Sequence, residues 1–310
     1  MNLIFIGDVH GQFRKLNELF DHIAFDESKP PIDTKLVFVG DLIDNSLSAD
    51  TGYIELLTTV KRLVDNGLAH CIMGNHEFNA VGWATKNVKT GEWLRPHNVN
   101  NAMQHQDFLH EVGDGSEIHQ YWIDWFRTLP LFIDFEEVRV VHACWQQVSI
   151  DILDKYTNSN NQLKRRHWQL AFDKKEELHQ IIEVLLKGPE IELPAGNNFK
   201  DKTGITRKHI RSKWWLPNAN TYREIAQVQP DSVHLIPNIN VENEQIHEQQ
   251  TMPTFVGHYT LNNLPDILSK NVVCVDYNAA KGENPLVAYI WQGETELTND
   301  HFAFVSIDNG

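Results

Sequence analysis

Six side chains that can bind metal ions stand at the ends of apolar runs in this sequence. They are Asp8, His10, Asp41, Asn75, His142 and His258. Each one alone is most often a turn residue or a helix cap, but turns do not account for six such residues after five separate runs. Mixed carboxylate, imidazole and amide ligands suit Mn, Fe, Zn or Ni ions better than Mg or Ca ions. The pattern therefore predicts a metal site.

A site for two such ions needs one carboxylate that binds both, because two cations about 3.5 Å apart repel each other. Asp41 is the candidate for this bridging ligand. Asp8 and His10 lie two positions apart and would bind one ion together, and the asparagine and the two later histidines would bind the second. A hydroxide held between two such ions is a nucleophile available near neutral pH.

Strands that alternate with helices would position these side chains. Short apolar runs at 2–7, 35–41 and 68–75 predict buried strands. Between them, apolar residues at helical spacing predict helices over 13–25 and 51–67. This order predicts an α/β fold with a parallel sheet and right-handed crossovers, in which the carboxyl ends of the strands meet at one edge.

The rest of the chain continues the same architecture. Residues 78–130 are mostly helical in pattern and rich in tryptophan. Further strands are predicted at 138–143, 254–259, 271–278, 285–291 and 302–307. The polar and partly helical segment 146–235 is predicted to be a cap-like insertion over one face of a single domain spanning residues 1–310.

Composition narrows the classes of partner. The 310 residues suffice for a sizeable core, and the formal charge of −15 disfavours loose binding to nucleic-acid phosphates or to anionic membranes. The three cysteines show no disulfide framework, so we expect a reducing, cytoplasmic setting. We expect neither a signal peptide nor a membrane span, because no basic leader and no apolar run of about 18 residues is present.

Five short motifs resemble those of the calcineurin-like metallophosphoesterase superfamily. In chain order they are GDVHG (7–11), GDLID (40–44), GNHE (74–77), VHA (141–143) and GH (257–258). Within the superfamily the chain resembles the phosphoprotein-phosphatase branch, with its bacterial Ser/Thr phosphatases and symmetrical diadenosine tetraphosphatases. The resemblance implies a four-layer α/β/β/α sandwich with two metal ions at the sheet edges.

The resemblance also implies roles for individual residues. The six side chains above would be the metal ligands, with Asp41 binding both ions. His76 corresponds to the catalytic histidine that protonates the leaving oxygen, and Asp44 corresponds to the carboxylate that orients it. This pairing makes chemical sense, because an oriented imidazolium is a competent acid near pH 7.

The chain departs from the family pattern at two places. Thr260 stands where diester-cleaving relatives often carry a histidine, and Asn45 and Ser46 follow Asp44 where the branch reads Asp-Arg-Gly. The arginine that would hold a phosphate oxygen is therefore missing. Candidate replacements are Arg211, Arg207 and Arg95, and each of them could instead belong to a plain solvated surface. The missing arginine favours Arg211.

Three functions fit these residues. The first is a dimetal phosphatase of phosphomonoesters, either small molecules or phosphoproteins, with His76 as the general acid. The second is a nucleotide pyrophosphohydrolase of the diadenosine tetraphosphatase type, in which tryptophans would stack on the bases. The third is a non-catalytic binding module, which should have lost His76 or a ligand. Because the chain has lost none of these, we favour a metal-dependent hydrolase.

Overall fold

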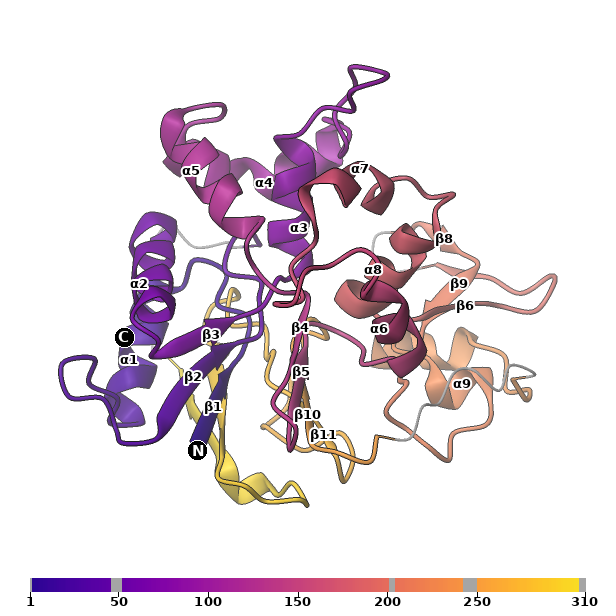
Figure 1. Ribbon diagram of the computed structural model, residues 1–310. Coiled ribbons are helices and arrows are strands. Elements are labelled where there is room, and N and C mark those ends of the chain that lie inside the picture. Colours follow the sequence, from indigo (N-terminus) through magenta and orange to yellow (C-terminus); the bar gives the residue numbers. More distant parts are fainter. Residues whose placement is uncertain (1, 46–51, 201–203, 242–249, 307–310) are drawn as a thin grey trace.

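Two β-sheets face each other in this protein, and helices cover their outer surfaces (Figure 1). The computed structural model describes residues 2–45, 52–200, 204–241 and 250–306. The first sheet has the strand order β13-β12-β1-β2-β3, and the second has the order β11-β10-β5-β4. The layering confirms the predicted α/β sandwich.

The first sheet holds the predicted parallel strands. Its members are β1 (Asn2–Ile6), β2 (Thr34–Phe38), β3 (Ala69–Cys71), β12 (Leu286–Trp291) and β13 (Phe302–Val305). The first three run parallel, and α1 (Phe13–His22) and α2 (Tyr53–Asp65) connect them. β12 and β13 add antiparallel strands on the other side of β1. β2 is shorter than predicted, because the chain turns sharply after it at Gly40 and Asp41, whose φ angles are 97° and 52°.

The second sheet collects strands from the middle and the C-terminal part of the chain. They are β4 (Phe132–Asp134), β5 (Arg139–Val141), β10 (Thr254–Val256) and β11 (Val272–Cys274). β5, β10 and β11 run parallel, whereas β4 pairs antiparallel with β5. The strands predicted after residue 254 thus divide between the two sheets.

Burial on both faces of the first sheet explains why the sequence of β1 is an almost unbroken apolar run. Leu3 and Phe5 point into the space between the sheets, and Ile4 and Ile6 point toward the helical layer on the other face. Phe5 stacks on Phe255 of β10, with ring centroids 3.7 Å apart. A strand that is buried on both faces has no polar alternation.

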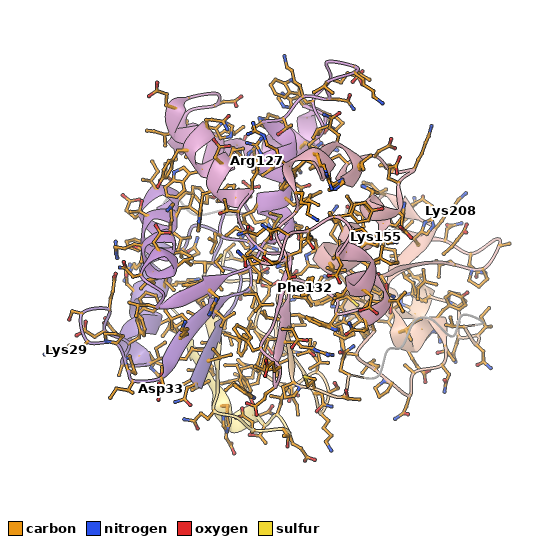
Figure 2. The ribbon with its side chains drawn as sticks, viewed as in Figure 1. Lys29, Asp33, Arg127, Phe132, Lys155 and Lys208 are labelled. Carbon is orange, nitrogen blue, oxygen red and sulfur yellow. The ribbon has the colours of Figure 1, made fainter. Side chains whose placement is uncertain are left out.

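Side chains fill the interior of the protein (Figure 2). Phe132 is buried near the centre of that view, whereas Lys29 and Lys208 are exposed at its margins. Among the described helices, none combines the length and the apolar character needed to cross a membrane.

Three helices join β3 to β4 and lie at the top of Figure 1. They are α3 (Asn75–Trp83), α4 (Val99–Val112) and α5 (Glu117–Phe126). These helices agree with the helical pattern predicted for residues 78–130. Trp122 and Trp125 of α5 are buried, and their i,i+3 spacing places them on the same face of the helix.

The segment predicted as a cap has two parts with different packing. Its first part comprises α6 (Gln147–Leu153), η1 (Arg165–His167), α7 (Trp168–Ala171) and α8 (Glu177–Lys187). Buried side chains of α6, α7 and α8 belong to the large core cluster that also contains Val141 and Val256 of the second sheet. These helices therefore form the outer layer of that sheet.

The second part is a small lobe with a hydrophobic cluster of its own. It comprises β6 (Glu190–Glu192), β7 (Phe199–Lys200), β8 (Thr206–Arg207), β9 (His209–Arg211), α9 (Tyr222–Ile225) and η2 (Pro230–Leu235). Its cluster includes Ile191, Ile210 and Ile225. The assignment of the whole segment 146–235 as one cap stays a prediction.

Candidate active site

The loops after β1, β2 and β3 leave the sheet at the same edge and bring the predicted residues together. Asp8 and His10 follow β1, Asp41 follows β2, and Asn75 is the first residue of α3 after β3. His10, Asp41 and His258 have φ angles of 47°, 52° and 68°, in the left-handed region that costs energy for residues other than glycine. Such strained backbone is common where side chains are aimed at a functional site.

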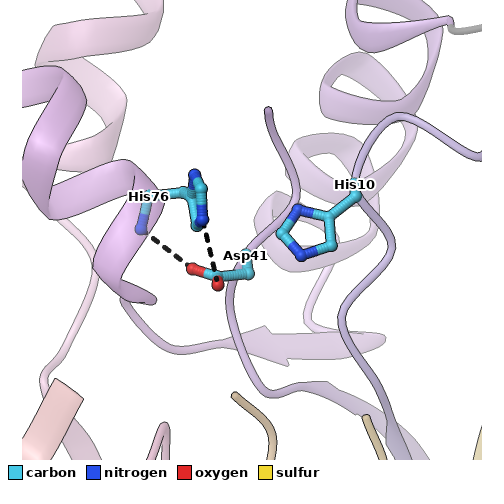
Figure 3. A group of neighbouring side chains, drawn as sticks. All are labelled: His10, Asp41 and His76. Atoms are coloured by element: carbon cyan, nitrogen blue, oxygen red, sulfur yellow. Dashed lines mark hydrogen bonds and ion pairs between the residues drawn. The ribbon is translucent and has the colours of Figure 1, made fainter. Parts of the chain in front are cut away.

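Asp41 lies at the centre of the cluster. The ligand atoms of His10, Asp41 and His76 all lie within 4.8 Å of one another, as do those of Asp41, His142 and His258. Figure 3 shows the first of these groups, with the three side chains around one point. Among the residues that the structure describes, Asp41 is common to both groups, as a bridging ligand must be.

Backbone carbonyls fix which ring nitrogen of two histidines is available. Nδ1 of His10 lies 2.8 Å from the oxygen of Ile43, and Nδ1 of His142 lies 2.7 Å from the oxygen of Val39. A carbonyl only accepts hydrogen bonds, so each Nδ1 carries a proton and Nε2 is the ring nitrogen left to face a metal ion. This second hydrogen bond is the usual arrangement for a histidine that binds a metal ion.

The amide oxygen of Asn75 joins the predicted ligands of the second ion. It lies 3.2 Å from Nε2 of His142 and 2.6 Å from Nδ1 of His258. Nε2 of His142 also lies 3.3 Å from Oδ2 of Asp41. The structure therefore brings Asp41, Asn75, His142 and His258 into one cluster.

Two buried atoms of this cluster have no hydrogen-bond partner among the described residues. They are Oδ1 of Asp8 and Nε2 of His258, although Oδ2 of Asp8 accepts the backbone N–H of His258 at 3.0 Å. A Cβ on Gly257 would lie 2.1 Å from the unpaired oxygen, so glycine keeps this space open. A buried unpaired polar atom costs about 1–3 kcal/mol. A bound cation would remove that cost, so the residues present fit metal ions.

The charges of the cluster support the same conclusion. Burial and the neighbouring carboxylates of Asp276 and Asp41 raise the pKa of Asp8 well above its usual range. Carboxylates crowd together in this way where a cation is expected to compensate them. Asp8 belongs to neither of the two three-residue groups, so its role as a ligand stays a prediction.

His76 and Asp44 form a buried pair beside the cluster. Nδ1 of His76 lies 2.8 Å from Oδ2 of Asp44, and both side chains are almost completely buried. Burial opposes the charge of His76, but the carboxylates of Asp41 and Asp44 raise its pKa to about 9. In this environment the imidazole carries a proton near neutral pH and can act as an acid.

Glu77 is a buried residue of the site that sequence reasoning missed. Oε2 accepts the backbone N–H groups of Asp41 at 2.9 Å and Gly74 at 3.0 Å, and Oε1 accepts that of Leu42 at 2.7 Å. Glu77 thus ties the loop that carries Asp41 to the start of α3. Its place three residues after the helix N-cap Gly74 is a capping-box position, and that signal could have revealed it.

Of the three predicted substrate-binding arginines, Arg211 carries a charge that acts on a predicted metal ligand, His258. Burial and the Arg211 guanidinium hold the pKa of His258 well below its usual value. Nε of Arg211 has no hydrogen-bond partner among the described residues, and Nη2 lies 3.8 Å from Oε1 of Glu190. The side chain is 31% exposed, so it is accessible from solvent.

The other two arginines lie in different surroundings. Arg207 is exposed on β8. Arg95 is buried, and its Nη2 donates to Gln104 at 2.5 Å and to Asn101 at 3.4 Å. The roles of these arginines in substrate binding stay predictions.

Asn45, which replaces the family's arginine, lies close to the buried pair. Its Nδ2 is 3.1 Å from Nε2 of His76 and 3.5 Å from Nε2 of His10. Ser46, the second departure from the family motif, lies outside the described residues. The amide of Asn45 thus lies beside the nitrogen from which a leaving group would take its proton.

The bridging role of Asp41 predicts a difference in metal content. Asp41→Asn is expected to lose more metal than Asn75→Ala, because Asp41 belongs to both groups and its negative charge offsets the repulsion between two cations. The metal-to-protein ratio of each variant is measured after loading with Mn and gel filtration. Asp33→Asn, at an exposed loop position, is the control. Equal and nearly full occupancy in the Asp41 variant would contradict the bridge.

Comparisons with known proteins agree with this arrangement. The family model described as calcineurin-like phosphoesterase matches residues 1–197. A symmetrical bis(5'-nucleosyl)-tetraphosphatase of Actinobacillus succinogenes is 31% identical over 147 residues, which are 46% of this chain and 44% of that protein. An asymmetrical bis(5'-nucleosyl)-tetraphosphatase of Geobacillus thermodenitrificans is 36% identical over 80 residues, which are 24% of this chain and 31% of that protein. The matched regions thus span less than half the length of these relatives.

One solved structure supports the fold alone. A protein serine/threonine phosphatase of Saccharomyces cerevisiae superposes with a TM-score of 0.50 at 14% identity, covering 100% of this chain and 81% of that one. The family model covers well over half of the sequence, and it includes the motifs that carry Asp8 to His142. This chain therefore belongs to the calcineurin-like phosphoesterase family.

Proposed function

We propose that this protein is a phosphoesterase that uses two metal ions to hydrolyse phosphomonoesters, with His76 as the general acid. The observation that carries the proposal is the His76–Asp44 pair beside the cluster centred on Asp41. A site of this composition combines cation binding with a proton donor. Those are the two requirements for cleaving a phosphoester with a poor leaving group.

The proposed roles follow from the contacts described above. The six predicted ligands would hold the ions, and Mn, Fe, Zn or Ni suits this mixture of nitrogen and oxygen donors. Two bound ions would supply Lewis acidity and a deprotonated water near neutral pH. Asp44 holds the imidazole of His76 through Nδ1, so that Nε2 can deliver a proton to the leaving oxygen. We also propose a cytoplasmic location, which the buried thiols of Cys71 and Cys274 support.

A second candidate is hydrolysis of dinucleoside polyphosphates. The names of the related tetraphosphatases favour it. The tryptophans that we considered as base-stacking residues do not strengthen it, because they are buried with the exception of Trp93. Trp93 is 38% exposed, but its ring stacks on that of His97 at 4.6 Å, and Nζ of Lys86 lies 4.7 Å from the ring centroid.

A substrate panel separates the two candidates. Metal-loaded protein is assayed with an aryl phosphate, a phosphopeptide and a symmetrical dinucleoside tetraphosphate, with a bis-aryl phosphodiester for comparison. We expect the highest kcat/KM for a phosphomonoester. A clear preference for the dinucleoside would establish the second candidate instead. Turnover of none of them by a fully metal-loaded protein would overturn both.

The arginine missing at Asn45 leads to a prediction for Arg211. Arg211→Ala is expected to raise KM for phosphomonoesters on the order of 10-fold, with unchanged metal content, because it removes a charge-assisted hydrogen bond to phosphate. Inhibition by free phosphate should weaken by a similar factor. Adding Asn45→Arg should partly restore both values, since a guanidinium can hold two phosphate oxygens.

The control for Arg211 is a cation on the same part of the chain. Lys208→Ala removes an exposed positive charge three residues away and should change neither KM nor phosphate inhibition. Phosphate inhibition that is identical in wild type and Arg211→Ala would contradict the prediction. It would indicate a site built for a larger or less charged substrate.

A further inference from the structure

We propose that His105 is a positioning residue for the His76–Asp44 pair. It holds the second oxygen of the Asp44 carboxylate, so that the carboxylate stays oriented and ionised behind His76. This inference rests on the proposed function, in which His76 donates a proton.

The geometry places Asp44 between two imidazoles. Oδ2 of Asp44 lies 2.8 Å from Nδ1 of His76, and Oδ1 lies 2.8 Å from Nδ1 of His105. All three side chains are buried, and those of Asp44 and His105 are 0% exposed. A carboxylate that is held at both oxygens cannot rotate about its Cβ–Cγ bond, so the oxygen that faces His76 is fixed.

Packing fixes the ring of His105 as firmly as its hydrogen bond does. His105 lies on α4, and the ring of Trp83 from α3 meets it edge-to-face at 5.7 Å. Phe108, one turn further along α4, lies 5.3 Å away. Side chains of α3 and α4 thus pack on the ring, and it cannot turn away from Asp44 without disturbing the core.

The hydrogen-bond pattern also fixes the tautomer of His105. An ionised carboxylate only accepts, so Nδ1 of His105 carries the proton. Nε2 is buried and has no partner among the described residues. Within the described part of the chain, the ring therefore makes one hydrogen bond, from Nδ1 to Asp44.

The charges around Asp44 support this role. Burial alone would raise the pKa of Asp44, but His105 and His76 hold it below its usual range. Asp44 also interacts with the buried guanidinium of Arg95. Burial lowers the pKa of Arg95, and the negative charge of Asp44 opposes that lowering. Without His105, Oδ1 would lose its donor, and the carboxylate would be free to rotate or to take up a proton.

The test compares two variants of His105 with a matched control. His105→Leu removes the donor, whereas His105→Asn keeps an amide N–H near the position of Nδ1. The matched control is His119→Leu. Like His105, His119 is buried and has no partner at Nε2 among the described residues, and its ring lies 6.1 Å from that of Phe108. For each variant, kcat and KM are measured over aryl phosphates of increasing leaving-group pKa, together with metal content and Tm.

We expect His105→Leu to lower kcat about 10-fold or more for poor leaving groups, in the range found for residues that orient a functional side chain. The loss should be smaller for good leaving groups, and KM and metal content should not change. His105→Asn should recover most of the activity. In an Asp44→Asn background, His105→Leu should cause little further loss. His119→Leu should lower Tm but keep the kcat of wild type.

Two outcomes would overturn the inference. One is a kcat for His105→Leu equal to that of His119→Leu over the whole substrate series, and the other is a His105→Asn variant no better than His105→Leu. If the leucine variant does not fold, the asparagine variant decides: it should keep most of the wild-type kcat, and a uniform loss across leaving groups would count against the role.

A readout without turnover separates this inference from the proposed function. In Zn-loaded protein, the Nδ1–H proton of His76 is observed by ¹⁵N-edited NMR. It should exchange faster with water in His105→Leu than in wild type or His119→Leu. Faster exchange in a protein that hydrolyses no phosphoester would overturn the proposed function alone. Activity in wild type without this change in exchange would overturn the role of His105 alone.

Discussion

Complete removal of metal ions is expected to abolish turnover of an aryl phosphate, and adding Mn back should restore it. The physical reason is the arrangement around Asp41, where carboxylates and imidazoles converge in a buried cluster. Without cations, the negative charge of Asp41 would repel the phosphoryl group of a substrate. No deprotonated water would be available near neutral pH either.

The experiment needs a verified metal-free preparation. The protein is treated with a chelator and passed through gel filtration, and its metal content is measured before the assay. Mn, Fe, Zn and Ni are then added singly, with Mg and Ca as ions that should restore less activity. Bound metal should also raise Tm, because it stabilises the folded state by mass action. Full activity in the metal-free protein would overturn the metal-dependent mechanism.

His76→Asn is expected to lower kcat by about 10²–10⁴ while the protein keeps its metal ions, because that is the usual contribution of a positioned general acid. The loss should depend on the leaving group. A substrate whose leaving group has a low pKa needs little protonation and should be nearly as fast in the variant as in wild type. The measurement is a plot of log kcat against leaving-group pKa, which should be steeper for the variant.

Asp44→Asn is the companion to this experiment. It should show the same dependence on the leaving group with a smaller loss, because Asp44 acts only through its 2.8 Å contact with the ring of His76. Metal content is checked in both variants, since His76 follows Asn75 directly in the chain. A loss of the same size for every leaving group would argue against His76 as the acid.

The sequence alone determined the order of elements and the family. The apolar runs of the first 75 residues predicted three parallel strands with two helices between them, and the structure has β1, β2 and β3 in that arrangement. The motifs at the ends of these runs predicted the family that the matching model confirms. Such features are readable because a strand, a helix or a turn imposes a period or a residue type over a few neighbouring positions.

Tertiary structure alone decided how distant residues meet. Nothing local showed that β12 would pair with β1 or that Asp44 would receive a second imidazole from His105, 61 positions along the chain. Nor did it show that the charge of Arg211 would act on His258. These contacts depend on which faces of separate helices and strands pack together, and a local pattern specifies that a face is apolar without specifying its partner.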